Sequence, residues 1–169
     1  MKNNTNKELT ETSKKEILII LSPVDFKDQE YEKLKIIFED ADFKIKIGSI
    51  QKGLATGANG TEVDIDLNIS EIDENDFEAI VFLGGEGMAK ITDDQALQFL
   101  AQKFFSAGKT TAAISDAVEI LEKAGLLKNL ESDFADENVI VDGLFVLAED
   151  SSLAKEFAEK IVKKLKNEI

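Results

Sequence analysis

The chain has 169 residues and a formal net charge of −14, from 20 basic and 34 acidic side chains. It contains no cysteine, histidine or arginine, which excludes disulfides, thiolate chemistry, a Ser-His-Asp triad and a histidine-ligated metal. The acidic balance argues against nucleic acid as a partner, because such binding rests on neutralising phosphates. The apolar runs are too short to span a bilayer and the amino terminus has no apolar signal region, so we expect a cytoplasmic protein with no membrane partner.

The first half of the chain alternates apolar runs of strand length with one amphipathic helix. Residues 1–14 are polar, and we expect them to form a disordered lead-in to a single domain over residues 15–169. The expected elements are a buried strand over 16–21, a helix over 27–41, a strand over 43–50, a loop over 51–59, a short strand over 63–67 and one helical turn within 70–77.

The second half continues the alternation of strands and helices. Its expected elements are a buried strand over 79–83, a helix over 93–107, a buried strand over 110–114, a helix over 117–126, a hairpin with strands 139–141 and 144–147, and a helix over 151–165. The hairpin is indicated by Asp142-Gly143, a typical two-residue turn. Short apolar strands that alternate with helices predict an α/β fold, a mostly parallel sheet covered on both faces in an α/β/α sandwich.

Ser115 and Asp116 stand at the turn between the strand over 110–114 and the helix that follows it. A hydroxyl at such a turn lies at the carboxyl edge of the sheet, beside free helix N–H groups that favour a nucleophile or an anionic ligand. Both residues are also ordinary at helix starts, where they need no further function. Gly84–Gly87 ends another strand, either as a backbone cradle for an anion or as a turn that requires positive φ values.

Four stretches resemble the DJ-1/PfpI superfamily, of the class I glutamine amidotransferase-like fold, in the order and spacing of that family. The stretch AISDAV (113–118), followed by AGLL (124–127), is similar to its nucleophile turn and the end of the next helix. Residues 18–30 resemble its first strand and glutamate-bearing turn, 60–85 its approach to a Gly-Gly strand, and 139–148 its late β-hairpin. The resemblance covers residues 16–166 and implies a flavodoxin-like sheet within the three-layer sandwich.

The resemblance also implies a site in which Glu30 lies beside Ser115, with the amides of Gly84 and Gly85 placed to hold an oxyanion. The family's nucleophilic Cys is Ser115 here and its following His is Asp116. A serine hydroxyl requires a general base, and the available candidates are Glu30, Asp116 or a lysine such as Lys27.

In the family's pattern a Gly-Pro follows the His, and this chain has Ala117-Val118 instead. Strain at a turn persists only when the surrounding fold enforces it, and this replacement tends to relax it. The sequence therefore leaves open whether Ser115 adopts the family's strained elbow.

Intact members of the family are peptidases, glyoxalases, deglycases or chaperone-like proteins, usually dimers, so the resemblance implies a homodimer. Because the Cys-His pair is replaced, we expect a non-catalytic or small-ligand-binding member whose pocket takes a small carbonyl or anionic ligand. One alternative is a serine-variant hydrolase or glyoxalase-like enzyme that uses Ser115 with Glu30. A second alternative is a chaperone-like or interaction module.

We expect neither a cofactor nor a metal at this site. Gly84–Gly87 lacks the remaining pattern of a dinucleotide fingerprint, which argues against NAD. Asp25, Asp28, Glu30 and Asp116 offer oxygen ligands for Mg²⁺ or Ca²⁺, but the acidity of the surface explains them equally well.

Overall fold

The computed structural model describes residues 14–169, so the expected lead-in over 1–14 lies almost entirely outside the described residues. The main sheet is formed by β1 (Glu16–Ile20), β3 (Lys44–Ser49), β6 (Leu67–Asn68), β7 (Ala79–Phe82), β8 (Thr110–Ile114), β9 (Val139–Asp142) and β10 (Phe145–Ala148). Its strand order is β6-β3-β1-β7-β8-β10-β9, and every pair is parallel except β10 with β9. The predicted α/β fold, with its mostly parallel sheet and late hairpin, is therefore confirmed.

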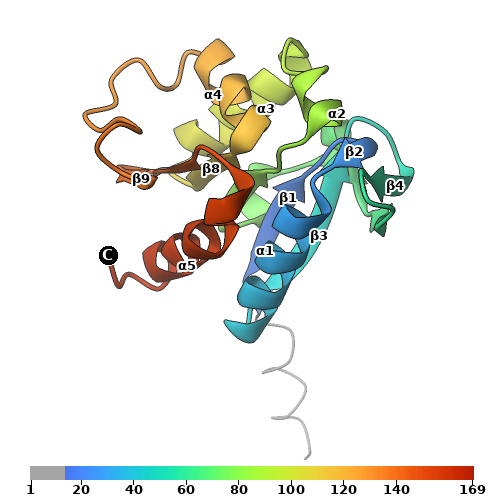
Figure 1. The fold of residues 1–169 in the computed structure, drawn as a ribbon, viewed down its shortest axis with the longest axis horizontal. Coiled ribbons are helices and arrows are strands. Elements are labelled where there is room, and N and C mark those ends of the chain that lie inside the picture. Colours follow the sequence, from blue (N-terminus) through green and yellow to red (C-terminus); the bar gives the residue numbers. More distant parts are fainter. Residues whose placement is uncertain (1–13) are drawn as a thin grey trace, which may run out of the picture.

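Helices cover both faces of this sheet, as the apolar strands predict (Figure 1). One face carries α1 (Asp28–Asp40) and α5 (Ala154–Leu165), and the other carries α2 (Glu86–Ala89), α3 (Gln95–Ser106) and α4 (Val118–Lys123). Alternate residues of a strand point to opposite faces. Ile17 and Ile19 of β1 accordingly join the core beneath α1 and α5, whereas Leu18 and Ile20 join the core beneath α3 and α4. No helix among the described residues is long and apolar enough to cross a membrane.

The prediction of a loop over 51–59 is wrong, because this segment contains a strand of a second sheet. That sheet consists of β2 (Val24–Phe26), β4 (Gly53–Gly57) and β5 (Glu62–Ile65). Its β4–β5 turn is held by Asp28, whose carboxylate accepts hydrogen bonds of 2.8 Å from the backbone N–H groups of Asn59 and Thr61. The pairing partners of β4 come from distant segments, so a local reading of its glycines predicts a loop instead of a strand.

Smaller differences concern the ends of elements. The turn expected within 70–77 is two 3₁₀ helices, η1 (Ile69–Glu71) and η2 (Glu74–Asp76). The late hairpin turns at Gly143-Leu144, one residue later than predicted, because Asp142 still pairs with Phe145. The helix after Ser115 begins as the 3₁₀ helix η3 (Ser115–Ala117), and α4 ends at Lys123, three residues earlier than predicted. The last helix likewise begins as η4 (Ser151–Leu153).

Candidate functional site

The three polar strand ends singled out in the sequence meet at one edge of the sheet. β1, β7 and β8 are parallel neighbours, so their carboxyl ends lie side by side. Residues 22–30 follow β1, Gly84–Gly87 follows β7, and Ser115–Asp116 follows β8. The fold therefore brings together Glu30, Gly84, Gly85, Ser115 and Asp116, the residues that the family resemblance assigned to one site.

Ser115 adopts the strained turn that the sequence left open. Its φ is 56°, in the left-handed region, where a residue with a side chain is disfavoured by about 1–2 kcal/mol. The residue before it, Ile114, is still extended, and the chain then enters η3 directly. The replacement of Gly-Pro by Ala117-Val118 therefore does not relax the elbow. The half-buried Ser115 hydroxyl donates to Oε1 of Glu30 at 2.5 Å.

Glu30 lies in the first turn of α1 and is completely buried. Its Oε1 accepts hydrogen bonds from the hydroxyls of Ser115 at 2.5 Å and Ser151 at 2.8 Å, and its Oε2 accepts the Gly84 N–H at 2.9 Å. Lys27 Nζ lies 3.9 Å from Oε1. Burial raises the pKa of Glu30, and the three donors and Lys27 oppose the rise. Glu30 is thus a stronger base than an exposed glutamate, but protein groups occupy both of its oxygens.

Ser151 is a member of the site that sequence reasoning missed. It is the first residue of η4, 121 residues after Glu30 in the chain. The neighbouring Asp150 supplies the cap of that helix, accepting a hydrogen bond of 2.8 Å from the Ser152 N–H. The Ser151 hydroxyl is therefore available to Glu30. A serine at the start of a helix is so common that the sequence carries no signal for this contact.

The amides expected to hold an oxyanion both donate to carboxylates of the protein itself. The Gly84 N–H donates to Glu30, and the Gly85 N–H donates to Oδ2 of Asp116 at 3.1 Å. Lys27 Nζ lies 4.0 Å from the same Asp116 oxygen. Gly85 has a φ of 130°, and a Cβ at this position would overlap the carbonyl oxygen of Asp25. This position therefore requires glycine for its backbone conformation and for the close approach of the β1–α1 connection.

Among the described residues, the four acidic side chains considered as metal ligands do not gather in one group. Asp28 faces the β4–β5 turn, where the amides of Asn59 and Thr61 occupy its two oxygens. Burial opposes ionisation of Asp28, yet hydrogen bonds from this turn lower the pKa of its carboxyl overall. Across residues 14–169, no group of three or more acidic side chains is arranged to hold a metal ion.

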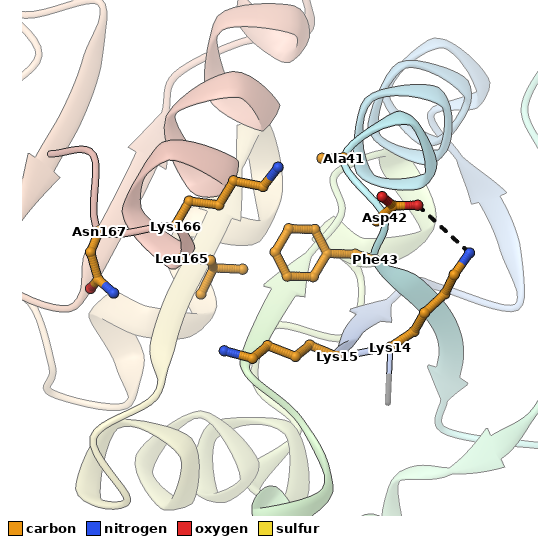
Figure 2. A pocket seen from close by; sticks show the side chains of 8 residues that line it. All are labelled: Lys14, Lys15, Ala41, Asp42, Phe43, Leu165, Lys166 and Asn167. Atoms are coloured by element: carbon orange, nitrogen blue, oxygen red, sulfur yellow. Dashed lines mark ion pairs between the residues drawn. The ribbon is translucent and has the colours of Figure 1, made fainter. Parts of the chain in front are cut away.

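A cavity of about 650 Å³ lies at the opposite, amino-terminal edge of the sheet. Figure 2 shows its lining, in which Phe43 and Leu165 lie between the side chains of Lys15 and Lys166, while Lys14 pairs with Asp42 at 3.8 Å. Lys166 directly follows α5, where a cation is favourable against the helix dipole. This position accounts for the Lys166 charge, and the cavity includes none of the residues gathered around Ser115.

Comparison with known proteins places this geometry in a family. The chain matches the DJ-1/PfpI family over residues 15–164. It is 29% identical over 168 residues to the deglycase PfpI of Pyrococcus furiosus, covering 88% of this chain and 99% of that protein. It is 30% identical over 148 residues to a deglycase of Pyrococcus abyssi, covering 76% of this chain and 87% of the relative.

A solved structure supports the same assignment. The ThiJ/PfpI domain protein of Brachyspira murdochii superposes with a TM-score of 0.85 at 35% identity, covering 93% of this chain and 99% of that one. The chain therefore belongs to the DJ-1/PfpI family.

Proposed function

We propose that this protein is a non-catalytic member of the DJ-1/PfpI family that binds a small polar ligand at the Ser115 elbow. The observation that carries the proposal is the hydroxyl of Ser115, which donates into a Glu30 carboxylate already engaged by two further donors. The relatives named deglycases do not transfer a thiol-dependent activity to this chain, because it has neither cysteine nor histidine.

Two features of the geometry argue against turnover. To activate Ser115, Glu30 must take its proton, but Ser151, Gly84 and Lys27 all stabilise the charged form of Glu30 and so weaken it as a base. A developing oxyanion would also compete with Asp116 for the Gly85 amide. The strained Ser115 backbone nevertheless persists, which supports a retained binding site, because such strain survives only where the fold enforces it.

One observation favours a serine-variant enzyme as the second candidate. The 2.5 Å contact joins a hydroxyl on a strained turn to a buried carboxylate whose pKa is raised, which is the arrangement of a nucleophile with its base. The two candidates differ in turnover. We expect no fluorophosphonate labelling of Ser115 and no turnover of ester, amide or dicarbonyl substrates.

The experiment compares the wild type with Ser115→Ala and, as a matched control, with Ser152→Ala at an exposed serine nearby. Turnover or labelling lost in Ser115→Ala but kept in Ser152→Ala would establish the enzyme and overturn the proposal. The proposed ligand binding is tested by NMR titration of the ¹⁵N-labelled wild type with acetamide, an unreactive neutral carbonyl compound. We expect saturable shifts at the amides of Ser115 and Gly85, and their absence would contradict ligand binding there.

We further infer that the protein is cytoplasmic and that it forms a homodimer, of which only the homodimer is implied by the family resemblance. The second sheet supports an interface, because Val24 on β2 and Leu54 on β4 expose 57% and 51% of their surface. Light scattering on the purified protein measures the mass directly. A monomer at all accessible concentrations would remove the homodimer from the proposal.

A further inference from the structure

Asp116 lies at the start of a helix, yet its side chain does not serve that helix. No side chain caps η3, and the Asp116 carboxylate instead reaches the backbone N–H of Gly85, 31 residues away in the sequence, at 3.1 Å. Lys27 Nζ is 4.0 Å from the same oxygen. A backbone N–H and an ammonium group are together well suited to hold an oxyanion. The carboxylate of Asp116 therefore occupies a position built for an anion.

The Gly85 N–H keeps its direction independently of Asp116. The Gly85 carbonyl accepts a hydrogen bond from the Ala89 N–H at 3.0 Å, and the residue is buried with a φ of 130°. A Cβ at Gly85 would overlap the carbonyl oxygen of Asp25, so the connection that follows β1 leaves no room for a side chain there. Removal of the Asp116 carboxylate would thus leave a fixed donor without an acceptor. The Asp116 side chain is 40% exposed, so a small ligand can reach the same place from solvent.

We propose that Asp116 determines the specificity of the site, because its carboxylate fills an anion-binding position formed by Gly85 N–H and Lys27 Nζ. It thereby excludes small molecules that carry a carboxylate or phosphate group, and it leaves the site to uncharged polar ligands. This inference concerns the same site as the proposed function and names its ligand class. Asp116 and Glu30 both face Lys27, so the loss of Asp116 removes one negative charge that an arriving anion would otherwise meet.

The test is a titration of the ¹⁵N-labelled full chain with inorganic phosphate at neutral pH and constant ionic strength, followed at the Gly85 amide. We expect Asp116→Ala to bind phosphate at least about tenfold more tightly than the wild type, since a fixed donor is freed and a like charge removed. Asp116→Asn should fall between them, because its amide oxygen still accepts from Gly85 but carries no charge. Adding Lys27→Met to Asp116→Ala should abolish the gain.

Asp150→Asn provides the matched control, because it removes an exposed charge that also acts on Lys27 electrostatically and does not contact Gly85, while its amide oxygen can still accept from the Ser152 N–H. An equal gain in phosphate affinity in this variant would show that any nearby negative charge has the same effect, and it would overturn the inference. Unchanged phosphate affinity in Asp116→Ala, or a gain that survives loss of Lys27, would overturn it as well. Thermal unfolding confirms that each variant is folded. Turnover by the wild type would contradict the proposed function and leave this inference standing.

Discussion

Glu30→Gln keeps the size and shape of a fully buried carboxylate while it removes the charge. Three donors converge on Glu30, two serine hydroxyls on Oε1 and the Gly84 N–H on Oε2. Glutamine has one acceptor oxygen and one NH₂ group, so it cannot accept all three bonds in the same way. The variant therefore measures how far the site depends on a charged acceptor.

The expected loss follows from the two orientations of the new amide. If the amide oxygen replaces Oε1, the Gly84 N–H faces an NH₂ group and is left without an acceptor, which costs about 1–3 kcal/mol. If the oxygen replaces Oε2, that bond is kept and the hydroxyls of Ser115 and Ser151 rotate to accept from the NH₂ group. The second orientation should be adopted. In that orientation the hydrogen bonds are neutral and therefore weaker, but the variant no longer buries a charge, which offsets part of the loss. The net loss of unfolding free energy should be about 1–2 kcal/mol at neutral pH.

The difference in unfolding free energy should also depend on pH. Burial raises the pKa of Glu30 above its ordinary 4.5, so the folded state binds more protons than the unfolded state between the two pKa values. The contribution of Glu30 titration to stability is therefore full below about 4.5 and is lost as the pH rises through the folded pKa. Glutamine does not titrate. The advantage of the wild type over Glu30→Gln should accordingly shrink from acidic towards neutral pH.

Urea unfolding of both proteins, monitored by circular dichroism at several pH values between about 4 and 8, measures this difference in unfolding free energy. Glu32→Gln, an exposed carboxylate on the same helix, is the matched control and should change stability by less than about 0.5 kcal/mol. A difference that does not vary with pH, or that grows as the pH rises, would refute the raised pKa of Glu30. A Glu30→Gln protein more stable than the wild type would refute the role of the three donors.

Two further predictions concern the connections that surround the site. Asp28→Asn should lower the unfolding free energy by about 1–3 kcal/mol, because asparagine cannot accept from both Asn59 and Thr61 in the same way. The pKa of Asp28 is lowered in the folded state, so the greater stability of the wild type should be present above the ordinary value of 3.8 and be lost as the pH falls through the folded pKa. A difference in unfolding free energy that stays constant with pH in urea unfolding would contradict this prediction. Gly87→Ala should cost about 1–3 kcal/mol or more, because its Cβ would overlap the Val24 carbonyl oxygen. Gly143→Ala meets open space but keeps a φ of 56°, which costs an alanine about 1–2 kcal/mol, so it should destabilise the protein less than Gly87→Ala. The reverse order in thermal unfolding would contradict this prediction.

Much of the fold could be predicted from local sequence. The strands over 16–21, 79–83 and 110–114 are apolar on both faces, and such runs between helices require a sheet that is covered on both sides. The absence of cysteine and histidine likewise settles, without any structure, which nucleophiles and bases are excluded. The resemblance to the family then placed Glu30 beside Ser115, a pairing that no local pattern indicates.

Other features depend on partners that are distant in the chain. β4 was missed because its glycines have the composition of a loop, and only pairing with β2 and β5 makes the segment a strand. Ser151 reaches Glu30 from the far end of the chain, and Asp116 bonds the Gly85 amide rather than capping its own helix. The layers of this protein and the chemistry that it lacks could both be predicted without a structure, because they follow from residue type and short-range periodicity. The donors that engage Glu30 and the group that accepts from the Gly85 amide could not be predicted in this way, because hydrogen bonds depend on the positions of atoms that only the folded chain brings together.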